Sequence, residues 1–178
     1  TLLVQAEYKG EKFTVDELVC TLFVTIVGGH ETTGSLISNG LYALLENPDQ
    51  LNLLKNNPTI APTAVEEFLR YYSPLEFATT RIAACDFTLQ NKEIKQHDYI
   101  FVGLASANRD PEQFDNPSIL DITRKNNKHI AFSSGVHFCM GSQLARLEAK
   151  IAFTTFLERF PNFELIGDLK ELKWKQGT

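Results

Sequence analysis

The chain has 178 residues, a length that favours one domain over two. Its 43% hydrophobic and 22% charged residues are ordinary for a globular protein with a buried core. The net charge of -5 argues against a nucleic-acid-binding surface, and the most apolar stretch, residues 15–27, is too short and too polar to span a bilayer. The sparse, odd set of cysteines suggests no disulfide framework and fits a reducing compartment: Cys20, Cys85 and Cys139. We therefore expect a cytoplasmic protein that binds neither nucleic acid nor membrane.

A long helix is predicted between Thr14 and the Asn47-Pro48 pair. Thr14 and Glu17 match the S/T-x-x-E capping box, in which side chain and backbone at the helix start bond each other reciprocally. The apolar residues within 18–27 occupy nearly all sides, a pattern that predicts a helix buried on most of its surface. With the proline as its stop, the helix spans roughly 33 residues, or about 50 Å at 1.5 Å per residue.

Shorter elements follow this helix along the chain. The patterns predict helices over residues 49–57, 61–74 and 142–160, a single helical turn over 104–111, two or three strands within 85–103, and a terminal hairpin over 163–175. Residues 111–141 form a long, mostly irregular segment, and such segments in compact domains are usually functional or disordered. The chain is therefore predicted to be mainly α with a minor β portion.

The segment GGHETTG, residues 28–34, places weak helix formers in the middle of the long helix. At this spacing the Thr32 hydroxyl can bond the Gly28 carbonyl and bend the helix, which leaves room for a small ligand against the backbone. Glu31 adds a carboxylate that can pass protons inward. The alternative is a helix–helix crossing made close by small residues. A zinc-protease motif H-E-x-x-H is excluded, because its fifth position is glycine.

The loop FSSGVHFCMG, residues 132–141, places Cys139 just before a predicted helix. The free N–H groups and partial positive charge of a helix start stabilise a thiolate, and Gly135 and Gly141 allow tight turns or close approach to a ligand. The loop therefore suits a thiolate held against a metal, although a small buried cysteine is an equal alternative. His137 would point the same way as the cysteine in an extended loop. A zinc site lacks a second ligand pair, so a histidine that orients an anionic group fits better than one that binds zinc.

Glu67 and Arg70 are three residues apart and share one face of a predicted helix. An exposed pair of this kind contributes about 0–1 kcal/mol. A buried pair would need further partners to satisfy its donors.

These motifs occur in a characteristic order. G-G-x-E-T-T lies in the long helix and is followed by E-x-x-R, by N-R-D-P and by F-x-x-G-x-H-x-C-x-G, which enters a helix. The order resembles that of the cytochrome P-450 superfamily of haem-thiolate monooxygenases, and its soluble bacterial type in particular, from about Tyr8 to Trp174. Family members are usually more than twice as long, so the resemblance implies that residues 1–178 are the C-terminal, haem-binding part of a single domain whose N-terminal part is absent. The implied fold has a long central helix, a small β region and a Cys loop before a helix.

The resemblance implies roles for residues around a haem b group. Cys139 corresponds to the proximal thiolate ligand of the iron, whose donation of electron density favours O–O cleavage. His137 and Arg81 resemble the residues that bind the haem propionates. Phe132 and Gly135 belong to the loop beside the haem.

The resemblance assigns further residues to dioxygen and to the protein scaffold. Gly28 and Gly29 match the groove in which dioxygen sits, Thr32 matches the alcohol that hydrogen-bonds it, and Glu31 matches its acidic neighbour in proton delivery. The scaffold residues resemble a buried structural pair with a third member: Glu67, Arg70 and Arg124. Serine stands at position 133, where the family usually has glycine, and we expect a small effect because serine adopts most turn conformations.

The implied activity is that of a monooxygenase, which inserts one atom of dioxygen into a small apolar organic substrate with two electrons and two protons. The electrons would come from a ferredoxin or flavodoxin type donor docking near Arg124, Lys125 and Lys128, and residues 75–78 are candidates for the substrate pocket. Two alternatives stay open, namely a haem-thiolate enzyme that uses peroxide and a truncated or inactive haem-binding fragment. The chain begins abruptly at Thr1, without an initiator methionine, and alone it is expected to be inactive.

Overall fold

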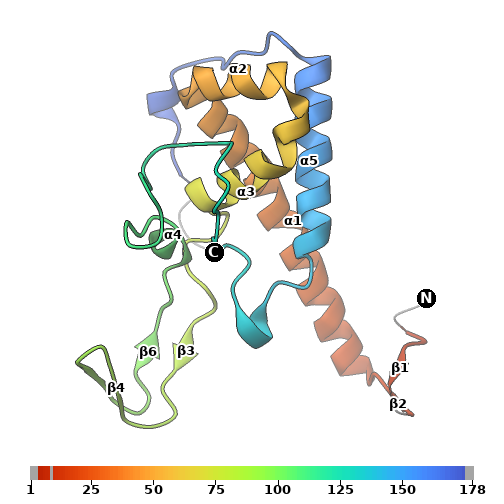
Figure 1. Ribbon diagram of the computed structural model, residues 1–178. Helices are drawn as coiled ribbons and strands as arrows, with labels where there is room; N and C mark the ends of the chain where they lie inside the picture. Colours follow the sequence, from red (N-terminus) through yellow and green to blue (C-terminus); the bar gives the residue numbers. More distant parts are fainter. Residues whose placement is uncertain (1–3, 9, 175–178) are drawn as a thin grey trace.

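The structure, a computed structural model, describes residues 4–8 and 10–174 and is mainly helical (Figure 1). The helices are α1 (Val15–Glu46), α2 (Pro48–Asn56), α3 (Ala61–Tyr71), α4 (Leu104–Ala107) and α5 (Ser142–Arg159), with 3-10 turns η1 (Pro58–Ile60), η2 (Gly135–His137) and η3 (Leu169–Glu171). Antiparallel strand pairs join β1 (Glu7–Tyr8) to β2 (Glu11–Lys12), β3 (Arg81–Ile82) to β6 (Tyr99–Ile100), and β4 (Phe87–Leu89) to β5 (Lys92–Ile94). The predicted class, mainly α with a minor β portion, is confirmed.

Helix α1 begins and ends where the sequence predicts. The Thr14 hydroxyl accepts a hydrogen bond from the Glu17 N–H at 3.2 Å, while the Thr14 N–H donates to the Glu17 carboxylate at 2.9 Å. This reciprocal pair completes the predicted capping box. Pro48 is the first residue of α2, so the chain turns directly from one helix into the next.

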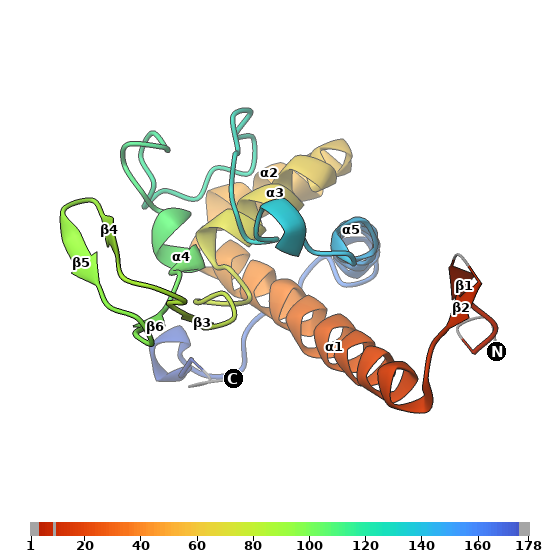
Figure 2. The same ribbon diagram turned by 90° about the horizontal axis from the view of Figure 1, so that it is seen from below.

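The first half of α1 is exposed, and the prediction of a helix buried on most sides is wrong there. Its exposed apolar side chains are those of Val15, Val19, Leu22, Phe23, Val24, Ile26 and Val27. The buried residues of α1 all lie in its second half, from Leu36 to Leu44. Figures 1 and 2 show the reason, since the first half of α1 extends beyond the helices that pack on the second half.

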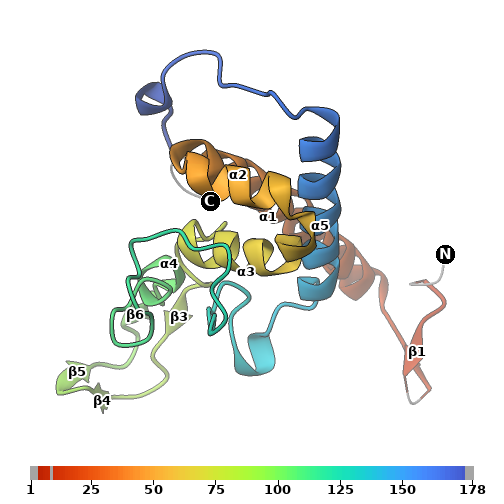
Figure 3. The same ribbon diagram turned by 45° about the horizontal axis from the view of Figure 1, so that its top comes forward.

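The core lies where the second half of α1 meets α3 and α5. Figure 3 shows α2 and α3 in front of α1, with α5 beside them. The rings of Phe68 on α3 and Phe153 on α5 have centroids 4.8 Å apart. Both rings lie against Gly40 of α1, where an added Cβ would come within 2.9 Å of Phe68 Cδ2 and still closer to Phe153 Cζ. Gly40 is therefore the position at which the helices approach most closely around these rings.

The remaining predictions of helices and strands are confirmed through α5, and the one after α5 is wrong. The helices after α1, the helical turn α4 and the three strands within residues 85–103 are confirmed. The terminal hairpin is wrong, because the described residues from 163 to 174 contain the turn η3 and no strand. Among the helices that the structure describes, including the long α1, none is both long and apolar enough to cross a membrane.

Candidate functional site

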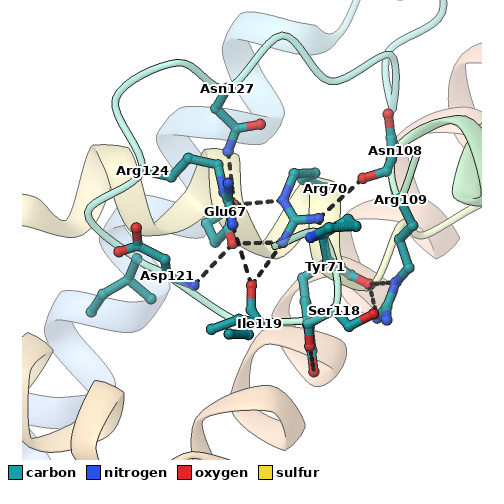
Figure 4. Close-up of polar contacts among 12 residues, drawn as sticks. Glu67, Arg70, Tyr71, Asn108, Arg109, Ser118, Ile119, Asp121, Arg124 and Asn127 are labelled. Carbon is teal, nitrogen blue, oxygen red and sulfur yellow. Dashed lines mark hydrogen bonds and ion pairs between the residues drawn. The ribbon is translucent and has the colours of Figure 1, made fainter. Parts of the chain in front are cut away.

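Arg70 lies fully buried in α3, and each of its five N–H donors has an acceptor (Figure 4). Nε and Nη2 donate to the two carboxylate oxygens of Glu67 at 2.8 and 2.7 Å. The other donors bond backbone carbonyl oxygens outside α3: Asn108 O at 3.1 Å, Pro117 O at 2.8 Å and Ile119 O at 3.1 Å. The guanidinium thus ties the irregular segment after α4 to the core helix.

The Glu67 carboxylate, also fully buried, receives three further hydrogen bonds from that segment (Figure 4). Arg124 Nε donates at 3.1 Å, Asn127 Nδ2 at 3.0 Å and the Asp121 N–H at 2.9 Å. The structure therefore places the three predicted scaffold residues in one cluster. Sequence reasoning missed the contributions of Asn127 and of the backbone, because nothing local marks contacts made across more than fifty residues.

The Cys139 loop runs from Phe132 to the start of α5. The Cys139 N–H donates to the Phe132 carbonyl oxygen at 2.9 Å, and the Ser142 N–H donates to the Cys139 carbonyl oxygen at 3.2 Å. Gly135 has a φ of +64°, in the left-handed region that glycine tolerates best. Cys139 is exposed, so the alternative of a small buried cysteine is wrong. Cys139 lies three residues before Ser142, the first residue of α5.

Ser133, in the same loop, has a φ of +62°. Left-handed backbone costs a residue with a Cβ about 1–2 kcal/mol, and glycine avoids this cost. The reason given for a small effect of serine at this position, that serine adopts most turn conformations, is therefore wrong. The loop carries local backbone strain directly after Phe132.

A second carboxylate of α3, Glu66, bonds different partners. Arg146 of α5 donates two hydrogen bonds to the Glu66 carboxylate, from Nε at 2.7 Å and from Nη2 at 3.0 Å. His129 Nε2 lies 3.0 Å from Glu66 Oε2. Burial raises the pKa of Glu66, but the hydrogen bonds to His129 and Arg146 and the charge of the guanidinium outweigh burial and lower this pKa from 4.5 to about 2. Hydrogen bonding to Glu66 in turn raises the pKa of Arg146. Sequence reasoning missed this cluster, whose members are separated by 63 and 80 residues.

The glycine-rich segment of α1 has open space beside it in the described part of the chain. An added Cβ on Gly28 or Gly29 would meet no atom within 4 Å among the described residues, so no other described helix crosses α1 closely at these glycines. The Thr32 hydroxyl donates to the Gly28 carbonyl oxygen at 2.6 Å, as its spacing predicts. Glu31 beside it is half-buried.

The remaining predicted residues lie on separate elements. His137 ends the turn η2 and is exposed. Arg81 lies in β3, half-buried, and its Nη1 donates to the Thr79 carbonyl oxygen at 2.6 Å. The structure thus brings Phe132, Gly135, His137 and Cys139 into one loop and leaves Arg81 outside it.

The surroundings of Cys139 bear on whether the loop fits a haem. Across residues 4–8 and 10–174, no group of three His, Cys, Asp or Glu side chains could hold a metal ion. The apolar neighbours of Cys139 in the loop are open to solvent, with Val136 98% and Met140 91% exposed. An exposed thiol among exposed apolar side chains suits a flat, apolar cofactor that takes one axial ligand.

Comparisons with known proteins give one consistent result. The sequence model described as Cytochrome P450 matches residues 1–168. A protein named Cytochrome P450 from Bacillus subtilis (strain 168) is 51% identical over 173 residues, which are 97% of this chain and 42% of that protein. The solved structure of the bacillaene polyketide synthase cytochrome P450 PksS from Bacillus subtilis 168 matches with a TM-score of 0.95 at 46% identity, over 98% of this chain and 45% of the other. The chain therefore spans less than half the length of these relatives.

Proposed function

This chain belongs to the cytochrome P450 family, and on that basis we propose that its full-length form is a haem-thiolate monooxygenase of which residues 1–178 are the C-terminal, haem-binding part. The observation that carries this proposal is the exposed Cys139 thiol at the end of F-x-x-G-x-H-x-C-x-G, immediately before α5. A haem b held by a cysteine thiolate activates dioxygen, because the thiolate donates electron density to the iron.

The residues of this chain would hold the cofactor from one side. Cys139 would supply the thiolate that binds the iron, with its backbone fixed by the Phe132 carbonyl. His137 and Arg81 would bind the carboxylates at the cofactor's edge, since both can present a positive charge to an anion. Gly135 would let the loop backbone approach the ring plane closely, because it carries no side chain and adopts a positive φ.

Helix α1 would supply the residues that handle dioxygen and protons. Gly28 and Gly29 leave open space beside the helix. The Thr32 hydroxyl, already donating to Gly28 O, can accept a hydrogen bond from water or a ligand in that space. Glu31 would pass protons toward it from solvent.

We further propose a small apolar organic substrate and a ferredoxin or flavodoxin type electron donor in a cytoplasmic setting. The exposed apolar side chains of Leu75 and Phe77 support an apolar lining for the substrate pocket. The exposed Lys125 and Lys128 support an acidic donor, because opposite charges speed encounter.

The Cys139→Ala substitution tests the central claim. We expect the full-length protein, loaded with haem, reduced and exposed to carbon monoxide, to show a strongly red-shifted Soret band that the variant lacks, because alanine offers no thiolate. The absorption spectrum of both proteins is the measurement. Cys85→Ala, a change at another exposed cysteine, is the control and should keep the band. A full-length protein that binds no haem, or a red-shifted band that survives Cys139→Ala, would overturn the proposal.

The Thr32→Ala substitution tests proton delivery. We expect haem binding to persist while the product formed per reduced nicotinamide falls about tenfold and peroxide rises, because the Thr32 hydroxyl would no longer position the water or ligand through which a proton is delivered, and positioned proton transfer contributes at least this much. Product and peroxide are both quantified per nicotinamide consumed. Thr25→Ala is a matched control, because Thr25 makes the same bond, to the Thr21 carbonyl at 2.7 Å, two turns earlier in α1. Unchanged product yield in Thr32→Ala, or efficient turnover with peroxide alone in the unaltered protein, would count against the assigned role.

A further inference from the structure

Beyond the ligand itself, the structure shows what holds the ligand's loop in place. We propose that Glu66, His129 and Arg146, here called the Glu66 cluster, position Phe132 and the Cys139 loop on α5 and so set the geometry in which Cys139 is presented to the haem. The proposal rests on the proposed function of Cys139. The three residues are positioning residues, because they act through Phe132 and touch no reacting atom.

Arg146 connects the cluster to the loop. Its guanidinium carbon lies 4.5 Å from the centroid of the Phe132 ring, within the range of a cation–π contact. The carbonyl oxygen of Phe132 is the acceptor for the Cys139 N–H. The residue that Arg146 covers is therefore the one that fixes the backbone of the cysteine.

His129 connects the cluster to the residues that directly precede Phe132. The Ala131 N–H donates to His129 Nδ1 at 3.2 Å, so Nδ1 is unprotonated. Nε2 must then carry the ring proton and donate it to Glu66 Oε2 at 3.0 Å. Both ring nitrogens therefore have a hydrogen-bond partner, and the ring centroid lies 6.0 Å from that of Phe132. Residues 129–132 are thus fixed at both the backbone and the ring.

Glu66 joins the two arms. Its two oxygens accept the two hydrogen bonds from the Arg146 guanidinium, and Oε2 also accepts one from His129. A single carboxylate on the core helix α3 therefore orients both residues. Removing its charge would leave Arg146 with no anchor on α3 while its guanidinium is still largely covered, at 28% exposure. The stack on Phe132 would then lose its fixed direction.

The first experiment needs no haem. Amide hydrogen exchange is measured in the 178-residue chain and in Glu66→Gln, Arg146→Met and the milder Arg146→Lys. We expect the Cys139 amide to exchange about tenfold faster in Glu66→Gln and Arg146→Met, equivalent to about 1.4 kcal/mol, and by an intermediate factor in Arg146→Lys, which keeps the charge but loses the fork. Exposed residues of α5 provide matched controls, Glu158→Gln and Arg159→Met, which should leave this amide unchanged.

The amide of Phe153, in the core part of α5, separates positioning from general destabilisation. It should keep its protection while the loop amide accelerates. Equal acceleration of both amides, or no acceleration at Cys139, would overturn the proposal.

The second experiment uses the haem-loaded, full-length protein. In Glu66→Gln and Arg146→Met we expect a smaller share of the reduced, carbon monoxide-bound protein in the red-shifted band, with the control variants unchanged. An unaltered share would overturn the link to the ligand. Absence of haem from the unaltered protein would instead overturn the proposed function, and the exchange experiment would then test only whether the Glu66 cluster positions the loop.

Discussion

Replacing Arg70 by methionine is expected to destabilise the protein by about 3–5 kcal/mol, because removing one partner leaves the other charge buried. Glu67 would keep only the weaker donors from the segment that follows α4. The carbonyl groups of Asn108, Pro117 and Ile119 would lose a donor each. Since domains are stable by only about 5–15 kcal/mol, much of the stability would be lost. The free energy of unfolding from urea titration measures the effect.

Two further variants define how this result is interpreted. Arg159→Met removes an exposed arginine from α5 and should change the free energy of unfolding by no more than about 0.5 kcal/mol. The double variant Glu67→Gln/Arg70→Met should be more stable than the sum of the single changes predicts, because it removes both charges of the Glu67–Arg70 pair together. A loss below about 1 kcal/mol for Arg70→Met, as for an exposed ion pair, would contradict the structural role of the cluster.

Two glycines of α1 are expected to respond to alanine with opposite signs. At Gly40 a methyl group would collide with the rings of Phe68 and Phe153, and overpacking of this kind costs about 1–3 kcal/mol. At Gly34 the methyl would meet no atom within 4 Å among the described residues. Alanine there should stabilise the helix by up to about 1 kcal/mol. The urea midpoints of Gly40→Ala and Gly34→Ala in the 178-residue chain measure both effects.

The comparison has a clear failure condition. A stabilised Gly40→Ala would mean that the two rings move aside without penalty, and that the close packing of α1 against α3 and α5 is looser than the contacts indicate. A destabilised Gly34→Ala would mean that something in the folded chain needs glycine at a position where the described residues leave open space.

Local chemistry made part of this structure predictable from the sequence. The Thr14–Glu17 cap and the Thr32 to Gly28 hydrogen bond involve residues three or four apart, so spacing alone identifies them. The close approach of rings to Gly40 depends on which helices meet, and spacing carries no such information. Spacing also does not show where along a helix its partners lie. The apolar pattern therefore predicted burial for the first half of α1, although the partners that pack on α1 lie along its second half.

Backbone conformation was the other limit. A serine in the sequence does not indicate a left-handed φ. The angle that Ser133 adopts follows from the way the chain turns between Ile130 and Cys139. The resemblance to a family pointed to Glu67, Arg70 and Arg124, which the structure brings together. It left out Glu66, His129 and Arg146, since no motif that was used includes them together.

The neighbouring carboxylates of α3 also constrain the order in which the chain can fold. Successive residues of an α-helix point about 100° apart, so Glu66 and Glu67 acquire their separate directions only once α3 is helical. Asn127 binds one carboxylate and His129 the other. The long irregular segment before the cysteine therefore has no template to follow in an unfolded chain. We therefore expect this segment to take its native path only once α3 is helical, and so to order late in folding.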